Sequence, residues 1–184
     1  MPSIFYPSST IKTTTWSGGT TSELFIYPEG SEFKTGNYQL RLSIATVEVE
    51  ESNFTSLPGV ERTLMVLEGE LRLKHEGEHE IILKPLEKDH FSGDWNTQSW
   101  GKVTDFNLMT KGNCKGELNG YILEGKHSFP IQLSEFKTFI HLRSGEIQIE
   151  GKTLKPGDSM LFTKIDNIQI DTIEESLIIV VEFN

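Results

Sequence analysis

The sequence contains a single cysteine, Cys114, and no long apolar run. One cysteine cannot form an internal disulfide or a thiolate metal cluster, and this scarcity is typical of proteins kept in a reducing compartment. No stretch approaches the ~20 consecutive apolar residues of a membrane-spanning helix. Residues 1–7 have neither the basic start nor the apolar run of a secretory signal peptide. These absences predict a soluble, cytoplasmic protein with no membrane partner.

Basic residues are also scarce. The chain has 17 Lys and Arg against 27 Asp and Glu, which leaves a net charge of −10. Because non-specific nucleic-acid affinity depends on clustered Lys and Arg, this balance argues against a nucleic-acid partner. With 184 residues, of which 36% are hydrophobic, the chain is long enough to bury a substantial core. A small molecule or another protein is the expected partner.

Long helical periodicity is hard to find, whereas alternation with period two recurs along the chain. Residues 39–45 alternate between an apolar face and a face that carries Arg41 and Ser43. Residues 70–74 and 80–83 flank Glu76-Gly77-Glu78, which is a hairpin signal. Further strands are expected at 64–67, 103–109, 121–123, 139–142, 146–150, 159–162, 168–170 and 177–183, and a short helical turn near 133–136. The pattern predicts an all-β protein with little helix.

Two segments of the chain resemble each other. Residues 63–73 and 138–149 each contain an apolar strand, a Gly turn followed by Glu, and an alternating strand. Each is followed by Leu-Lys-Pro, at 83–85 and 154–156. This shared order favours an internal duplication over a chance similarity of two hairpins. We expect two β-barrels in tandem, residues 1–112 and residues 113–184, with the ligand pocket in the first and the two packed as one unit.

Both segments also resemble the core of a cupin barrel, which implies an RmlC-like jelly-roll fold for each half. Cupins typically bind a metal through two His and a Glu of one motif and a His of a second motif. Alignment on Gly69 places Arg62 at the Glu position, residues 55–58 at the first two His positions and Ser99 near the last one. A cation at the Glu position reverses the electrostatics that a metal needs. We therefore expect no metal and no other cofactor in either half.

Two histidines outside that motif flank the hairpin turn. His75 and His79 could face each other across it. A pair on an exposed rim, without outer-shell support, does not predict a metal site.

A larger set of motifs is similar to the HutD/Ves family. The motifs are Trp16–Glu23, Arg41–Ala45 followed by Glu48, Phe54–Arg62, Phe91–Asp94 and Asp105–Met109, in this order. The resemblance covers about residues 10–183. It implies a cytoplasmic, bicupin protein with a small-ligand pocket and, for some members, a regulatory link to histidine utilisation or to stress. No established reaction comes with it.

Strand faces bring several polar residues together. Arg41 and Ser43 share one face, and Asp105 and Asn107 share another, because side chains alternate along a strand. With Arg62, which replaces the metal ligand, these faces predict a pocket in which two guanidinium groups suit a carboxylate. The alternative is a structural Arg–Asp pair that joins strands without a ligand. Residues 16–21 are expected to form a tight turn whose Trp16 either covers the pocket or only packs.

These observations predict a metal-free bicupin that binds a small acidic metabolite through Arg62, Arg41, Ser43, Asp105, Asn107 and Trp16. The rival hypothesis is a cofactor-independent isomerase or hydrolase that uses Asp105 or Glu61 as general base. A third alternative is a scaffold that dimerises through exposed strands, and a homodimer is kept open.

Overall fold

The computed structural model describes residues 3–124, 128–132, 137–163 and 167–184, and these residues are almost entirely β. Two 3-10 helices of three residues each, η1 (Ser8–Thr10) and η2 (Phe33–Thr35), are the helical elements in this part of the chain. The helical turn expected near 133–136 lies outside the described residues. Within the same ranges, no helix is long and apolar enough to cross a membrane. The prediction of an all-β fold is confirmed.

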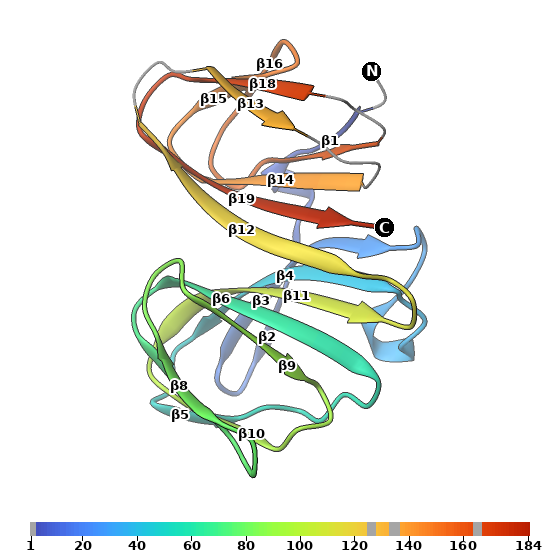
Figure 1. The fold of residues 1–184 in the computed structure, drawn as a ribbon, viewed down its shortest axis with the longest axis vertical. Helices are drawn as coiled ribbons and strands as arrows, with labels where there is room; N and C mark the ends of the chain where they lie inside the picture. The colour runs from blue at the N-terminus through green and yellow to red at the C-terminus, as the bar shows by residue number, and fades with distance from the viewer. Residues whose placement is uncertain (1–2, 125–127, 133–136, 164–166) are drawn as a thin grey trace. The chain divides into compact units, whose positions relative to one another are not determined.

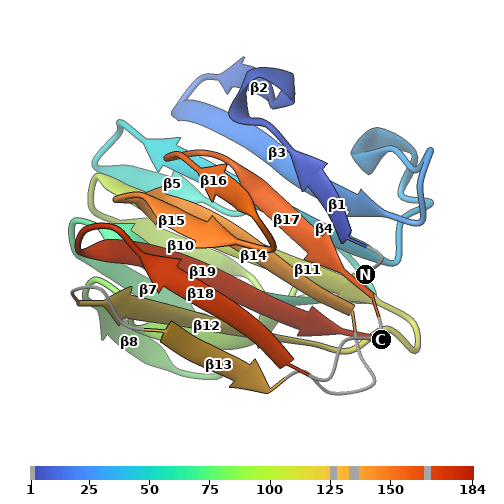
Figure 2. The same ribbon diagram turned by 90° about the horizontal axis from the view of Figure 1, so that it is seen from above.

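The chain divides into two compact units, one of residues 12–115 and one of residues 1–11 with 116–184 (Figure 1). The expected boundary at 112/113 and the observed one at 115/116 lie close together. Residues 1–11 differ from the expectation, because β1 (Ser3–Tyr6) pairs with β17 (Ser159–Phe162) and so joins the second unit (Figure 2). Backbone pairing with a strand distant in sequence leaves no local signal in residues 3–6.

The unit of residues 12–115 consists of two antiparallel sheets. The larger sheet has the order β2-β3-β4-β11-β6-β9, with β2 Lys12–Trp16, β3 Gly19–Tyr27, β4 Leu40–Val47, β11 Val103–Lys111, β6 Val60–Glu68 and β9 Lys88–Ser92. The smaller sheet has the order β5-β10-β7-β8, with β5 Glu51–Asn53, β10 Thr97–Trp100, β7 Leu71–His75 and β8 Glu80–Leu83. Side chains from both sheets meet in one apolar cluster that includes Leu64, Leu73 and Phe91. The two sheets therefore enclose a common core.

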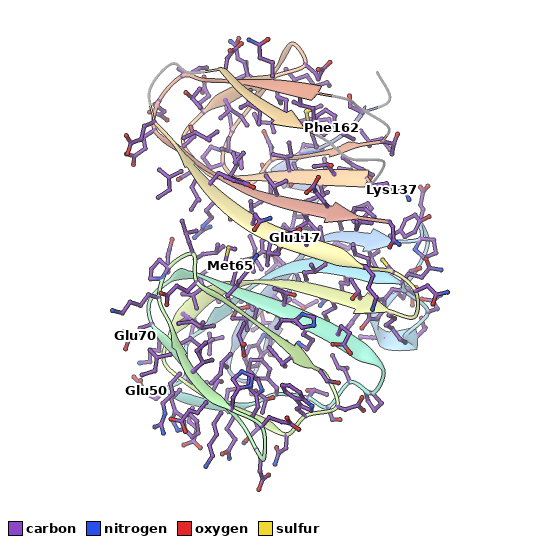
Figure 3. All side chains as sticks on the ribbon, in the orientation of Figure 1. Glu50, Met65, Glu70, Glu117, Lys137 and Phe162 are labelled. Atoms are coloured by element: carbon purple, nitrogen blue, oxygen red, sulfur yellow. The ribbon has the colours of Figure 1, made fainter. Side chains whose placement is uncertain are left out.

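The other unit has the same plan. Its larger sheet has the order β1-β17-β14-β19-β12, with β14 Lys137–Ser144, β19 Ser176–Phe183 and β12 Gly116–Leu123. Its smaller sheet has the order β13-β18-β15-β16, with β13 Ser128–Gln132, β18 Asn167–Thr172, β15 Ile147–Ile149 and β16 Lys152–Leu154. Phe162 is fully buried in its core, whereas Glu50 and Glu70 lie exposed on the first unit (Figure 3).

The two segments that resemble each other occupy equivalent places. β6 and β14 lie in the larger sheets, β7 and β15 lie in the smaller ones, and a glycine with positive φ, Gly69 or Gly145, joins each pair. β9 and β11 flank β6 as β17 and β19 flank β14. The strand order within each unit therefore agrees with the duplication that the sequence indicates.

Gly69 and Gly145 are required for two reasons. Their φ angles are 89° and 83°, a region that disfavours residues with a Cβ atom. A Cβ on Gly69 would lie 2.6 Å from the carbonyl oxygen of Lys102, and one on Gly145 would lie 2.4 Å from that of Glu175. The chain can therefore cross between the sheets at these points only without a side chain.

We expect Gly69→Ala to lower the free energy of unfolding by about 1–3 kcal/mol, because it combines strain at positive φ with a backbone clash. Urea unfolding measures this loss. Gly77→Ala is the matched control, since Gly77 has φ 81° but nothing within 4 Å of its added Cβ. Equal losses in the two variants would show that the close approach to Lys102 contributes nothing.

Candidate functional site

A cavity of about 780 Å³ occupies part of the interior of the 12–115 unit. All six side chains that the sequence singled out line it, namely Trp16, Arg41, Ser43, Arg62, Asp105 and Asn107. The larger sheet thus presents a polar inner face beside the apolar cluster of the same unit. The alternation in β4 explains this face, since Arg41 and Ser43 line the cavity while Leu40 and Leu42 are fully buried on the other side.

Strand register brings these side chains into adjacent rows. Met109 of β11 lies opposite Arg41 of β4 and opposite Arg62 of β6, and Asn107 lies opposite Ser43. Directly paired side chains on one face of a sheet are within reach of each other. The polar groups of these three strands therefore converge although they are up to 66 positions apart in sequence, between Arg41 and Asn107.

Arg62 and Asp105 are joined through the amide of Asn107. Arg62 Nη2 donates to Asn107 Oδ1 at 2.9 Å, and Asn107 Nδ2 donates to Asp105 Oδ1 in a short contact. Because a guanidinium can only donate, the amide orientation follows from its two neighbours. All three side chains are buried. Arg62 and Asp105 thus form a relay across β6 and β11 in which an amide stands between the two charges.

Most of the hydrogen-bonding capacity of Arg62 is unused. Of its five N–H groups, the described residues satisfy one, and the buried Nε atom has no hydrogen-bond partner among them. Phe54 and Phe91 approach its guanidinium carbon, with ring centroids at 4.6 and 5.2 Å. Burial lowers the pKa of Arg62 to about 10, so the side chain stays protonated at neutral pH. A buried cation with unused donors calls for an anionic or strongly accepting partner.

Asp105 is fully buried on the inner face of β11, and this burial raises its pKa to about 7. The charge of Arg62 and the hydrogen bond from Asn107 oppose the shift. The carboxyl group therefore changes its charge near neutral pH. Below that pH, the charge of Arg62 has no buried counter-ion in the relay.

Arg41 is already neutralised. Its Nε donates to Glu23 Oε2 of β3 at 2.7 Å, and its Nη1 donates to Ser43 Oγ at 3.3 Å. Phe33 of η2 covers its guanidinium at 4.2 Å. The sequence motif included Glu23, but its contact with Arg41 depends on the pairing of β3 with β4, which sets Glu23 opposite Ser43, on the same face as Arg41. Of the two arginines, Arg62 is therefore the one available to a ligand.

Trp16 lies at the end of β2 and is 39% exposed. Its Nε1 donates to Thr21 Oγ1 at 3.2 Å, and its ring packs against Gly18, where a Cβ would lie only 2.1 Å away. Both Trp16 and Gly18 line the cavity. The tight turn predicted for residues 16–21 is the β2–β3 hairpin turn, and it holds the indole at the solvent-accessible part of the cavity.

The metal that a cupin would bind does not fit these residues. Arg62, Ser99, Thr55 and Leu57, which stand at the expected ligand positions, do line the cavity. They offer a guanidinium, two hydroxyls and an apolar group, none of which is a ligand that divalent metals prefer.

Other candidate groups lie outside the cavity. Glu61, the second general base considered from the sequence, does not line it, and its Oε2 atom instead lies 3.3 Å from Nε2 of the exposed His90. Among the described residues, one group of potential metal ligands is present, formed by His75, His79 and Asp89. The sequence indicated the two histidines but not Asp89, which β9 contributes from the other sheet.

Solved structures share this fold. A cupin 2 conserved barrel domain protein from Leptotrichia buccalis is 11% identical and matches 94% of this chain and 92% of its own, with a TM-score of 0.58. A conserved protein of unknown function from Pseudomonas aeruginosa PAO1 is 22% identical over 100% of both chains, with a TM-score of 0.81. The protein therefore has the all-β jelly-roll fold of cupins.

A sequence-family model gives a more specific assignment than the shared fold. The HutD family model matches residues 8–180, so the chain belongs to the HutD family. The structure of HutD from Pseudomonas fluorescens SBW25, described for a formate condition, is 20% identical over 100% of both chains, with a TM-score of 0.74. No curated protein matches the sequence significantly.

The raised pKa of Asp105 predicts a pH dependence of stability. Between its ordinary value of 3.8 and about 7, the native state holds a proton that the unfolded state has lost, so the free energy of unfolding falls as pH rises. Between pH 5 and 8 this contribution is on the order of 2 kcal/mol. Urea unfolding of the unaltered protein and of Asp105→Asn at both pH values measures it. We expect the variant to lose this part of the decline, and an equal decline in both proteins would contradict the assignment.

Proposed function

We propose that the protein binds a small acidic metabolite in the cavity of the 12–115 unit and acts as a ligand-binding, regulatory protein. The observation that carries the proposal is Arg62, a buried cation that lines the cavity with most of its donors unused. Its planar fork matches a carboxylate better than any neutral ligand.

Charge balance supports an anion. The positive charge of Arg41 is matched by Glu23, whereas the counter-charge for Arg62 depends on Asp105, whose pKa is raised to about 7. Glu51 also lines the cavity, but it is exposed to solvent. A ligand carboxylate would supply the missing charge in the buried part of the site.

The size and polarity of the cavity indicate the ligand class. A volume of about 780 Å³ lies within the range of small-molecule sites, roughly 300–1,000 Å³. Ser43 and Asp105 also line the cavity and provide hydroxyl and carboxyl groups, and an amide N–H of the ligand could donate to Asp105. Dicarboxylates and N-acylated acidic amino acids combine these features. Formate, named with the HutD structure from Pseudomonas fluorescens, is the smallest carboxylate probe.

The family supports a proposal for the biological role. Membership of the HutD family supports regulation connected with histidine utilisation. A role in a stress response is the alternative, since the resemblance to the HutD/Ves family also implies a link to stress for some members. The single buried Cys114 is consistent with the proposed cytoplasmic location. Formation of a homodimer stays a prediction that sedimentation analysis can check.

A second candidate is an enzyme that acts on a small carboxylate. Asp105 favours it, because a general base works best when its pKa lies near the working pH. Glu61 cannot serve this site, since it points away from the cavity. Conversion of a bound ligand, followed by NMR and abolished in Asp105→Asn, would establish the enzyme over the binding protein.

Arg62→Ala tests the binding proposal. A charge-assisted contact contributes ~1.5–3 kcal/mol, so the affinity for a carboxylate ligand should fall roughly tenfold to a hundredfold. A thermal-shift screen of formate, dicarboxylates and N-acylated acidic amino acids, followed by calorimetry of the hits, measures the loss. The ligand-induced shift is compared rather than the melting temperature, because the substitution also leaves Asn107 Oδ1 without its donor.

Arg72→Ala is the matched control, since Arg72 belongs to the same unit but forms an exposed pair with Glu80. It removes the same net charge and should leave the ligand-induced shift unchanged. If Arg62→Ala destabilises the protein but retains the full shift, Arg62 is a structural residue and the proposal is wrong.

The affinity should also depend on pH. As pH rises through about 7, Asp105 ionises, and its negative charge repels an anionic ligand and offsets the positive charge of Arg62. Carboxylates should therefore bind up to about tenfold more weakly at pH 8 than at pH 6. Calorimetric titrations at the two pH values measure the change. Asp105→Asn should bind with similar affinity at both, and a retained pH dependence in this variant would exclude Asp105 as its origin.

A further inference from the structure

The group of His75, His79 and Asp89 lies outside the cavity. His75 ends β7, His79 lies in the turn before β8, and Asp89 belongs to β9. β7 and β8 are strands of the smaller sheet, whereas β9 is an edge strand of the larger one. The three side chains therefore meet where the two sheets of the unit come together.

Their ligand atoms already converge. His75 Nε2 lies 2.9 Å from Asp89 Oδ2, and His79 Nε2 lies 3.0 Å from the same oxygen. One ligand atom from each residue can be chosen so that all three lie within 4.8 Å of one another. Ligands at about 2.0–2.2 Å from a tetrahedral metal are themselves roughly 3.3 Å apart. A small widening of the present hydrogen bonds would therefore admit an ion.

Outer-shell groups hold the buried histidine in place. His75 Nδ1 lies 2.7 Å from Thr97 Oγ1, and that hydroxyl lies 3.4 Å from the carbonyl oxygen of Trp95. Nδ1–H can thus donate to Thr97 while the hydroxyl donates to Trp95, which leaves the Nε2 lone pair facing Asp89. Phe91 and Trp95 also pack on the imidazole, with ring centroids at 4.5 and 5.5 Å. Such support orients a metal-binding imidazole.

In this tautomer three acceptors face one point, and acceptors that close together need a cation between them. In the metal-free protein the proton of each neutral imidazole can lie on Nε2 instead and be donated to Asp89, with His75 Nδ1 accepting from Thr97, and a divalent ion would take the place of these protons. The side chain of His75 is inaccessible, whereas that of His79 is 39% exposed, so an ion can enter from the solvent side. Two imidazoles and one carboxylate, with one position open to water, suit Zn²⁺.

We propose that His75, His79 and Asp89 bind a zinc ion that ties the β7–β8 hairpin to β9 across the edge of the sandwich. The proposal concerns the rim of the unit and not the cavity, where Arg62 opposes a metal. It replaces the expectation from the sequence that the two histidines lie on an exposed rim without outer-shell support. It also stands independently of the proposed carboxylate site.

The test uses tag-free protein treated with a chelator and then titrated with Zn²⁺ by calorimetry and with Co²⁺ by visible absorption. We expect one equivalent per chain and the absorption bands of a tetrahedral Co²⁺ site. His79→Ala and Asp89→Asn should each weaken binding at least a hundredfold. Thr97→Val should weaken it about 10–100-fold, because it removes only the outer-shell hydrogen bond.

His90→Ala is the control, since His90 lies next to Asp89 in β9 but is exposed and pairs with Glu61. It should bind Zn²⁺ and Co²⁺ as the unaltered protein does. Circular dichroism confirms that each variant is folded. Failure of the unaltered protein to bind Co²⁺ saturably would overturn the proposal, as would equal affinity in His79→Ala or a loss of affinity in His90→Ala.

Discussion

The guanidinium of Arg62 is buried inside an all-β unit, and the polar part of the interior is arranged around it. Removing a charge from water costs several kcal/mol unless neighbouring groups compensate. Two aromatic rings, the Asn107 amide and a distant carboxyl group at Asp105 provide part of that compensation. None of these groups forms a direct carboxylate–guanidinium contact with Arg62. This incomplete compensation is the basis of our proposal that a bound ligand supplies an anion to the cavity.

The same residue is the basis for proposing that this cupin fold binds an anion in its cavity rather than a metal. The strand order positions a side chain of β6 toward the interior whether it is a carboxylate or a guanidinium. Replacing a metal-binding Glu by Arg62 changes the site from one that attracts cations to one that attracts anions. The zinc site proposed at the rim is formed by residues that do not line the cavity and that the jelly roll places at the meeting of its two sheets.

Much of this arrangement could be predicted from the sequence. Alternation in residues 39–45 and 103–109 identified the inward faces of β4 and β11, and the glycine turns indicated the duplicated plan. The links that the sequence could not supply depend on register between strands. Glu23 becomes the partner of Arg41 only through the pairing of β3 with β4, and Asp89 reaches His75 only because β9 borders the other sheet. β2 has no buried residue and is rich in threonine, so it carries no apolar alternation to detect.

The most direct test of the central claim is an NMR titration of the arginine Nε–H signals with formate or a dicarboxylate. The Nε–H resonance of Arg62, assigned by its loss in Arg62→Lys, should shift in a saturable way. The resonance of Arg41, whose Nε already donates to Glu23, should change much less. Ligand binding that leaves the Arg62 resonance unmoved would contradict the account.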